Sequence, residues 1–278
     1  MTVLAVLLAV ELAVQNYAQH LADEVVVTTP GLLVIAMHVS PPGMANYPIV
    51  ASNIGRIGKP ADDDDMRVIN TGKTNLEVAH GGTRFEVELP MRDLAGETVG
   101  AIGLVFPYKA GDSKGALEKK AVAIRDRLAA RTLDAASLVE PYPFDPLATT
   151  KTHAQKLVDE TLAKHPELMV VAMHVTPPKG HENIMLASNF GRIGKKADDD
   201  DMNVIASGKP RSGAYGDGKR YGVELPLQDE AGNTVGALSL GWRTANEDAG
   251  TFLSRAERIR DELRKRIPSI EKLVELDP

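Results

Sequence analysis

Two hydrophobic periods alternate along this chain, and each predicts a different kind of element. Segments such as AQHLADEVV and SRAERIRDELRKRI place apolar residues three or four positions apart among charged ones, which predicts amphipathic helices. Between such segments, LLVIAMHV and PIVASN are short apolar runs rich in β-branched residues, which predicts strands. A Pro-Pro pair ends the first run, so we expect the two runs to form a hairpin.

The pattern that follows completes a small α+β unit. In GRIGKPADDDDMRVINTGK a polar loop leads into a short helix, and Gly72 is a typical C-cap for its end. RFEVELPMRD and TVGAIGLVF are then predicted strands joined by a tight turn around Gly96. The order of elements predicts a central antiparallel sheet of about five strands, with the N- and C-terminal helices packed on it.

The same unit is written twice. LVIAMHVSPP recurs as MVVAMHVTPP, and an offset of 136 positions carries His38 onto His174 and aligns the longer segment ASNIGRIGKPADDDDMRVI with ASNFGRIGKKADDDDMNVI. A repeat of this length is too long for a solenoid unit and matches a complete domain. We therefore expect two domains, 1–142 and 143–278, divided at the proline-rich segment VEPYPFDPLATTKT.

Composition narrows the function classes. The 278 residues suffice for two domains with cores of their own, and 43% hydrophobic with 25% charged residues is typical of a globular protein. A formal charge of -6 argues against nucleic-acid binding, and 4% aromatic residues leave few stacking surfaces for bases or sugars. The absence of cysteine excludes disulfides, thiolate metal sites and a cysteine nucleophile.

The first 14 residues are almost wholly apolar, but Glu11 interrupts them and no basic residue precedes them. A signal peptide normally starts with basic residues, and a membrane helix needs about 20 apolar ones. Two interpretations stay open, namely an amphipathic helix packed on the domain and the remnant of a signal or anchor segment.

Several short motifs recur in both copies. They are an Ala-Ser-Asn strand, a Gly-Lys-acidic segment before a short helix, a Gly-Lys pair after that helix, and a closing strand pair with Pro, Asp and Gly at fixed spacings. In the first copy the matching residues are Ala51, Ser52, Asn53, Gly58, Lys59, Asp65, Thr71, Gly72, Lys73, Leu89, Pro90, Asp93, Gly96, Val99 and Gly100, and in the second copy Ala187, Ser188, Asn189, Gly194, Lys195, Asp201, Gly208, Lys209, Pro226, Asp229, Gly232 and Gly236. With these motifs the chain resembles the Cache group of PAS-like sensor domains over nearly all of both copies.

The resemblance implies an extracytoplasmic domain that binds small metabolites, often carboxylates, amino acids or amines, in a pocket on one sheet face. Relatives of that kind are mostly parts of chemoreceptors, kinases or cyclases, whereas this sequence contains no such transducing module. We therefore expect a sensor or solute-binding protein of the periplasm or cell envelope, with a cytoplasmic location left open. A separate membrane transducer and a second copy of the chain are the partners considered.

Four consecutive aspartates precede the short helix of each copy, as Asp62 to Asp65 and again as Asp198 to Asp201. Adjacent carboxylates repel each other unless a cation or a helix N-terminus offsets their charge. A calcium loop would alternate its ligands and add a bidentate Glu, which this run lacks. The pattern favours N-capping by one Asp with the others solvated, and leaves Asp62, Asp65, Asp198 and Asp201 as weaker metal-ligand candidates.

Arg56 and Arg192 lie beside glycines in the polar loop, and Lys59 and Lys195 follow three positions later. A guanidinium group placed in this way could hold an anionic ligand through two parallel hydrogen bonds. The alternative is that these cations neutralise the neighbouring aspartates.

The strand residues His38 and His174 share a face with Ala36 and Ala172, and small neighbours beside a polar group suggest a cavity. A hydrogen-bonded core histidine is nevertheless the commoner role and the favoured one. Metal binding would need a second histidine at suitable spacing, which the sequence lacks.

Arg84 and Glu88 share one strand face, as do Arg220 and Glu224 in the second copy. Ion pairs on a solvated face are the commoner explanation, and ligand contacts follow if that face is concave. Tyr215, Tyr221 and Trp242 occur only in the second copy, which favours a more selective second pocket. The complete predicted ligand-binding set is His38, Asn53, Arg56, Lys59, Arg84, Glu88, His174, Asn189, Arg192, Lys195, Arg220, Tyr221, Glu224 and Trp242.

Catalytic motifs are absent from the sequence, which has no phosphate-binding glycine loop, no serine elbow and no HExxH helix. The aspartates of each run are too close together to flank a substrate as acid and base. We predict a non-enzymatic sensor or solute-binding protein, without cofactor, for small polar or anionic metabolites. A scaffold with closed pockets and a metal-dependent hydrolase that uses the aspartate runs are the alternatives.

Overall fold

The computed structural model describes residues 15–145, 148–244 and 247–277. Both interpretations of the apolar segment 1–14 concern residues outside these ranges. Along the described ranges, no helix combines the length and the apolarity that crossing a bilayer requires.

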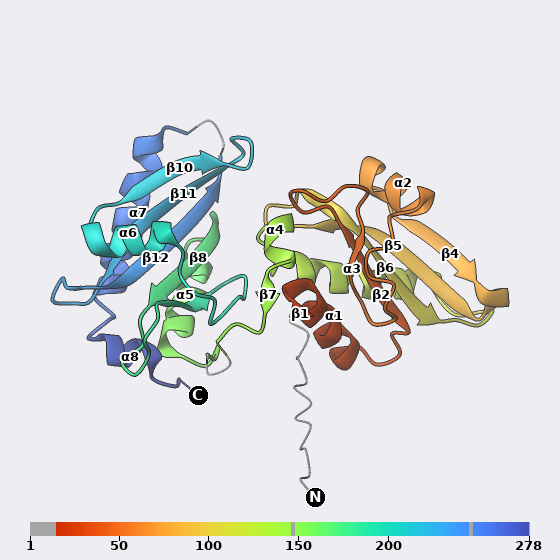
Figure 1. The fold of residues 1–278 in the computed structure, drawn as a ribbon, viewed down its shortest axis with the longest axis horizontal. Helices are drawn as coiled ribbons and strands as arrows, with labels where there is room; N and C mark the ends of the chain where they lie inside the picture. The colour runs from red at the N-terminus through yellow and green to blue at the C-terminus, as the bar shows by residue number, and fades with distance from the viewer. Residues whose placement is uncertain (1–14, 146–147, 245–246, 278) are drawn as a thin grey trace, which may run out of the picture.

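Helices and strands of the first half follow the predicted order (Figure 1). They are β1 (Gln15–Asn16), α1 (Tyr17–Thr28), β2 (Val34–Val39), β3 (Ile49–Ser52), α2 (Asp63–Thr71), β4 (Asn75–Ala79), the 3₁₀ turn η1 (His80–Gly82), β5 (Arg84–Arg92), β6 (Thr98–Pro107), α3 (Lys114–Ala129), α4 (Ala135–Leu138) and β7 (Pro141–Tyr142). The β2–β3 hairpin and the turn between β5 and β6 are confirmed.

The second half repeats this order from its first long helix onward. Its elements are α5 (His153–Lys164), β8 (Leu168–Val175), β9 (Ile184–Ser188), α6 (Asp199–Ser207), β10 (Arg211–Tyr215), β11 (Arg220–Gln228), β12 (Thr234–Arg243), α7 (Ala249–Arg264) and α8 (Ile270–Val274). His165 and Pro166 follow the end of α5, as the sequence predicts.

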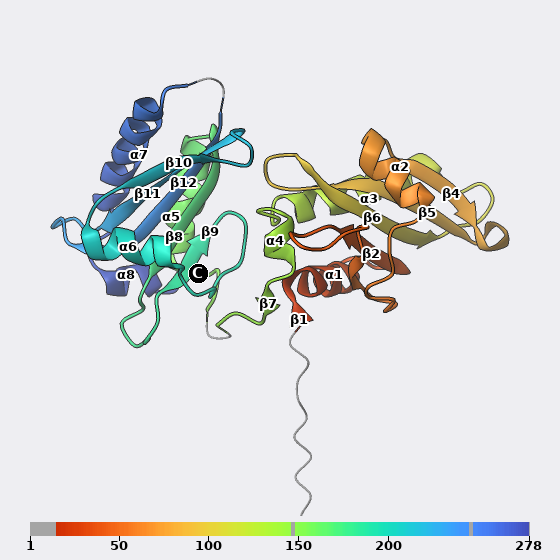
Figure 2. The same cartoon turned by 45° about the horizontal axis from the view of Figure 1, so that its top comes forward.

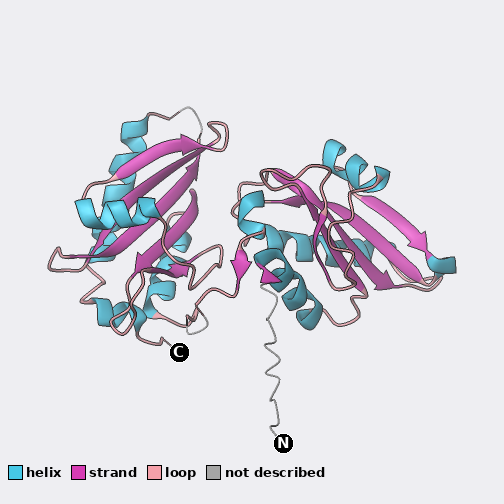
Figure 3. Cartoon of the chain, viewed as in Figure 1, coloured by secondary structure: helices cyan, strands magenta, loops and turns pink. Residues whose placement is uncertain are grey.

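Each half contains a 5-stranded antiparallel sheet, in the order β3-β2-β6-β5-β4 in the first half and β9-β8-β12-β11-β10 in the second. Figure 3 shows both sheets with their helices. The predicted fold class, α+β with a five-stranded antiparallel sheet and packed helices in each half, is confirmed. The boundary between 142 and 143 stays a prediction, although the short strand β7 pairs with β1 and so belongs to the first half by its hydrogen bonds.

The two faces of each sheet differ in what covers them. In the second half, α5 and α7 supply Leu157, Val158, Phe252 and Ile259 to a core on one face, while α6 contacts β11 and β12 from the other face (Figure 2). The first half has the same arrangement, with α1 and α3 on the core face and α2 on the opposite one. Because strand residues alternate between faces, odd and even positions have separate roles.

Apolar and charged contacts join the two halves. Leu94, Ala95 and Leu133 of the first half pack against a cluster in the second half that includes Met185 and Phe190. Asp93, which precedes Leu94 in the chain, forms a buried ion pair with Arg220. Both side chains are at most 8% exposed. Lys219 adds an exposed pair with Glu97, with 2.8 Å between Nζ and Oε2. Part of the second sheet therefore faces the first half.

Candidate functional site

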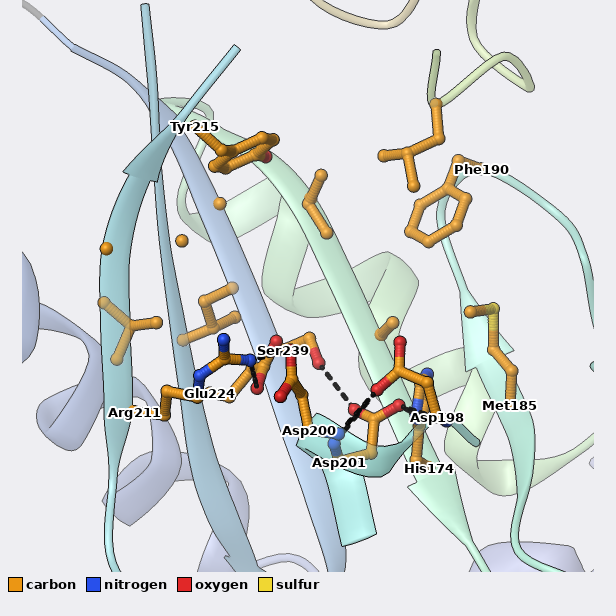
Figure 4. Close-up of a pocket in the computed structure, with 18 of the residues that line it drawn as sticks. His174, Met185, Phe190, Asp198, Asp200, Asp201, Arg211, Tyr215, Glu224 and Ser239 are labelled. Carbon is orange, nitrogen blue, oxygen red and sulfur yellow. Dashed lines mark hydrogen bonds and ion pairs between the residues drawn. The ribbon is translucent and has the colours of Figure 1, made fainter. Parts of the chain in front are cut away.

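A cavity of about 440 Å³ lies on the face of the second sheet that α6 covers (Figure 4). Strands β8 to β12, the start of α6 and the loop after β9 line it, and Leu133 and Asp134 of the first half complete its wall. Residues from both halves therefore enclose one pocket.

Strand alternation and small residues create the space. On β8, Ala172 and His174 face the cavity, whereas Val171 and Met173 belong to the core on the other face. Gly213, Gly222 and Gly241 on β10, β11 and β12 also line the cavity and contribute no side chain to fill it. A Cβ added at Gly241 would lie 2.9 Å from the Cβ of Val170, so the close approach of strands β12 and β8 requires glycine there.

The cavity has an apolar end and a polar end. Phe190, Val170, Met185 and Leu133 belong to one apolar cluster. The ring of Tyr215, which is 38% exposed, lies across from Phe190 (Figure 4). In Figure 4 the labelled polar side chains Arg211, Glu224, Ser239, Asp201 and His174 gather at the opposite end. Pockets for small molecules commonly combine apolar walls with a few oriented polar groups.

Two acidic side chains at the polar end have fixed structural partners. Asp198 caps α6, and its side chain accepts hydrogen bonds from the backbone N–H groups of Asp200 and Asp201. Asp201 forms a buried ion pair with His174, at side-chain exposures of 4% and 9%. Burial raises the pKa of Asp201, but the hydrogen bond and charge of His174 outweigh burial and hold that pKa below its usual value.

Glu224 differs from these acids, because its Oε2 atom is buried and has no hydrogen-bond partner among the described residues. The nearest cationic group is Nη1 of Arg211, 3.8 Å away, and that guanidinium is paired with Asp200. Burial, followed by the charge of Asp201, raises the pKa of Glu224 against the opposing effect of Arg211. Glu224 is therefore an acceptor available to a ligand.

Arg192 and Lys195 line the cavity, as predicted, but both are bound to Glu140 at the end of the first half. Lys195 Nζ lies 2.9 Å from Glu140 Oε1, and the Arg192 side chain is only 4% exposed. Their carboxylate partner is thus Glu140, and not the neighbouring aspartates that the sequence offered as one alternative. A partner 52 positions away in sequence carries no local signal.

Two predicted aromatic contacts lie outside the cavity. Trp242 is 2% exposed and packs in the core of the second half, and the ring of Tyr221 stacks on Phe252 of α7 at a centroid distance of 4.6 Å. Both positions have the parity of the core face, which corrects the prediction that they contact a ligand. Tyr215 and Phe190 are the aromatic residues of the second copy that do line the pocket.

The two predicted asparagines bind backbone. Asn53 Oδ1 accepts a hydrogen bond from Ile35 N at 2.9 Å, and Asn189 Oδ1 accepts one from Val171 N at 2.8 Å. Each side chain therefore ties the end of one strand to its neighbour. Arg220 is also engaged elsewhere, since it binds Asp93 and donates to the backbone oxygen of Leu133 at 3.1 Å.

In the first half, His38 holds the loop before β3. Its Nδ1 lies 2.8 Å from the backbone oxygen of Tyr47, and its Nε2 lies 3.4 Å from Asp65 Oδ2. Both contacts fit the structural role that the sequence favoured for this histidine. Arg56 is exposed in its loop, and Lys59 lies 3.3 Å from Asp62.

Arg84 and Glu88 occupy the face of the first sheet that corresponds to the cavity. Arg84 lies 3.3 Å from Nε2 of His80, and Glu88 accepts a hydrogen bond from Asn75 at 2.9 Å. The expected Arg-Glu ion pair is therefore replaced by contacts to β4 and η1. Burial and the nearby charges of Asp65 and Glu86 outweigh the Asn75 hydrogen bond and raise the pKa of Glu88 to about 7.

The predicted capping role of the aspartate runs is confirmed. Asp62 and Asp198 are the N-caps of α2 and α6, each with a reciprocal capping box to the third helical residue. The expectation that the other aspartates are solvated is wrong for Asp65 and Asp201, which are 5% and 3% exposed and face a histidine each. Within the described ranges, no group of three or more His, Asp and Glu side chains could hold a metal ion.

Sequence reasoning missed Arg211, Ser239, Met185 and Phe190 as cavity residues, and Glu140 as the partner of Arg192. A position-by-position comparison of the two copies contains a usable signal for the cavity. At the offset of 136, glycines of the second copy stand where the first has Glu77, Glu86 and Val105.

No protein-family model matches this sequence, and no curated protein is significantly similar to it. Among solved structures, the chain is similar to the PobR transcription factor inducer-binding domain from Acinetobacter, at 11% identity and a TM-score of 0.28 over 43% of this chain and 100% of that one. It is also similar to the cofactor-binding GAF domain of the nutrient sensor CodY from Clostridium difficile, at 13% identity and a TM-score of 0.29 over 56% and 99% of the two chains. A third structure is the E. coli DhaR(N)-DhaL complex, at 11% identity and a TM-score of 0.30 over 82% and 85%. Values this low assign neither a ligand nor an activity to this chain.

Proposed function

We propose that this protein is a non-catalytic, small-molecule-binding sensor or solute-binding protein whose ligand occupies the cavity of the second half. The observation that carries this proposal is the cavity itself, about 440 Å³ in volume, with an apolar end, a polar end and an unsatisfied Glu224 carboxylate oxygen. Its volume falls within the roughly 300–1,000 Å³ of typical ligand pockets.

The wall shared by both halves supports a sensing role. Leu133 and Asp134 belong to the loop before α4 in the first half, yet they line the cavity of the second. A ligand that touches both halves stabilises their contact, because binding free energy is gained only when both walls are in place. Ligand occupancy would thus bias the arrangement of the two halves, which is what a separate transducer or a second copy of the chain could recognise.

The chemistry of the polar end supports binding rather than catalysis. Asp198 is engaged in capping, Asp201 in its pair with His174, and Arg211 in its pair with Asp200. General acid-base chemistry needs a group free to exchange a proton with substrate beside a second group that takes part in the reaction. Glu224 offers the first of these groups, and its described neighbours are committed to one another. The Cache type and a periplasmic or cell-envelope location are part of this proposal and rest on the sequence resemblance.

The test is a thermal-shift screen of the whole chain against amines, amino acids, carboxylates and neutral analogues, followed by calorimetry of each hit. A ligand that binds only the folded state raises the melting temperature. Gly213→Phe supplies the decisive variant, because a Cβ at Gly213 meets no atom within 4 Å and the added ring extends into the cavity. We expect this variant to keep its fold and to lose the ligand.

Glu77→Phe is the matched control, since Glu77 pairs with Glu86 in the first sheet as Gly213 pairs with Gly222 in the second. The control should keep full affinity. Binding that survives Gly213→Phe would show that the site lies elsewhere, and a complete lack of hits would favour the scaffold alternative. Shifts with divalent metals alone would favour the hydrolase alternative.

A further inference from the structure

We infer that the ligand of this cavity carries a protonated primary amine on an apolar body, with the ammonium group bound between Glu224 and His174. This inference rests on the function proposed above and narrows its ligand class. The sequence led us to expect a small polar or anionic metabolite, with carboxylates, amino acids and amines as the classes considered, and the inference selects the amines among them.

The first step is that the cations around the cavity are already neutralised by the protein. Glu140 binds both Arg192 and Lys195, Asp200 binds Arg211, and Glu182 lies 2.6 Å from Lys196. An anionic ligand would have to displace one of these carboxylates, and at Arg192, which is 4% exposed, it would leave the displaced acid without its partner. The cavity therefore presents no ready anion site.

The second step is that the groups left open at the polar end are hydrogen-bond acceptors. In the part of the chain that the structure describes, Glu224 Oε2 is buried without a hydrogen-bond partner, and so is Nε2 of His174, a side chain that is 91% buried. The other ring nitrogen, Nδ1, lies against the Asp201 carboxylate, which can only accept while ionised. When the ammonium group binds, the imidazole keeps its proton on Nδ1 beside Asp201 and releases any proton on Nε2 to solvent, so that Nε2 accepts a hydrogen bond from the ligand.

The third step is that these acceptors lie together and carry net negative charge. Figure 4 shows Glu224, Asp201 and His174 on one end of the cavity, with Ser239 between them. Burial, then the charge of Asp201 and, less strongly, that of Asp198 raise the pKa of Glu224, and the charges of Arg211 and His174 only partly oppose them. A cation placed among them relieves this repulsion, and an ammonium group supplies three N–H donors for acceptors that now have none.

The fourth step concerns the remainder of the ligand. Phe190, Met185, Val170 and the ring of Tyr215 line the rest of the space, together with Asp134, whose side chain caps α4. Burying apolar atoms against these side chains contributes about 25 cal/mol per Å² of area removed from water. An aryl-alkyl or alkyl monoamine satisfies both ends.

The test compares three probes with one shared body by calorimetry on the whole chain at pH 7. They are 2-phenylethylamine, 2-phenylethanol and 3-phenylpropanoate, which present a cation, a neutral group and an anion. Hydrogen bonds to charged groups contribute about 1.5–3 kcal/mol, so the amine should bind at least tenfold more tightly than the alcohol. The carboxylate should bind more weakly than both.

Glu224→Gln removes the charge and keeps the shape. It should lower affinity for the amine at least tenfold and leave affinity for the alcohol unchanged, while the melting temperature of the free protein stays the same or rises. Glu88→Gln, at the corresponding position of the first copy, is the matched control and should leave amine binding unchanged.

The outcomes separate the inference from the function on which it rests. If the alcohol or the carboxylate binds as tightly as the amine and Gly213→Phe abolishes that binding, the ligand class is wrong and the binding function stands. If Glu224→Gln leaves the affinity for the amine unchanged and Glu88→Gln lowers it, the site assignment is wrong. If no compound of the broader screen binds, both the inference and the proposed function are overturned.

Discussion

The corresponding face of the sheet carries different residues in the two halves of this molecule. In the first half it bears Glu77, Glu86 and Val105, and in the second half glycines occupy the corresponding positions beside the cavity. The surrounding framework is unchanged, since both faces are covered by a short helix with an aspartate cap and both contain a buried His-Asp contact. Three side chains thus separate an acidic face from one with room for a ligand.

This contrast shows how a duplicated domain diverges without changing its fold. A strand accepts glycine or glutamate on a face outside its core at a modest energetic difference, because the core residues on the opposite face still specify the sheet. The strand residues that face the core, for example Val87 in the first copy and Val223 in the second, are 0% exposed. Binding chemistry can therefore change on one face while packing on the other holds the fold.

The largest expected effect concerns Arg220, which is buried against Asp93, and Arg84, which is the corresponding residue in the first copy. Arg220→Met leaves the Asp93 carboxylate, 2% exposed, without its cation. Breaking a buried pair in this way costs about 3–5 kcal/mol. Arg84→Met removes only a 3.3 Å contact with His80 and should change stability by at most about 0.5 kcal/mol. Urea unfolding measures both, and equal midpoints would contradict the comparison.

A second prediction concerns a substitution that places a residue of the first copy in the cavity of the second. Gly241→Val introduces the residue found at position 105, and its Cβ would lie 2.9 Å from Val170 and 3.3 Å from the Tyr215 hydroxyl. Overpacking of this kind costs about 1–3 kcal/mol, and ligand affinity should fall at least tenfold in calorimetry. Val105→Ala serves as the control and should leave affinity unchanged. Retained affinity in Gly241→Val would show that this glycine does not shape the site.

A third prediction concerns the helix cap that the two copies share. Asp62 and Asp198 form the same capping box at the start of α2 and α6, so their replacement by Ala should cost about 1 kcal/mol in each case. Thermal or urea unfolding of the two variants provides the measurement. A clearly larger loss for Asp198→Ala would mean that this residue supports the cavity beyond its capping role.

The smallest effect expected is a pH dependence that differs between the copies. The pKa of Glu88 is raised to about 7, so the folded state binds a proton that the unfolded state has released above its ordinary value near 4.5. Stability therefore falls as pH rises from about 4.5 to about 7, and is fully present only below that window. Glu88→Gln should flatten this fall in melting temperature.

Glu224→Gln should reduce the fall in melting temperature with pH by less than Glu88→Gln does, since Arg211 opposes the effect of burial on the pKa of Glu224. Melting temperatures recorded at pH 5 and pH 8 for both variants and the unaltered chain supply the comparison. A steeper pH dependence in Glu88→Gln than in the unaltered chain would contradict the assignment of the raised pKa.

Local features were within reach of sequence reasoning. The run of aspartates predicted an N-cap because a side chain three positions from its backbone partner needs no distant element, and Gly72 takes the left-handed conformation of a C-cap with φ of 66°. The hairpins followed from short apolar runs separated by turn residues. In each case, partners close in sequence determine the geometry.

The site itself was only half predictable. His174, Arg192, Lys195 and Glu224 were expected near a ligand and do line the cavity. Trp242 was misplaced because its ring was weighed as a ligand contact without regard to strand parity, which puts it on the core face. Strand parity is readable from sequence once the register is known, and would have separated Tyr221 from Glu224.

By itself, the sequence determined that the chain is a duplicated α+β unit, where its strands and caps lie, and that no cysteine chemistry operates in it. Tertiary structure alone decided that Glu140 neutralises Arg192, that Leu133 closes the cavity from the other half, and that Oε2 of Glu224 has no hydrogen-bond partner among the described residues. The physical reason is one of range. Periodicity and capping act over a few residues, whereas burial and charge pairing depend on which distant segments the fold brings into contact.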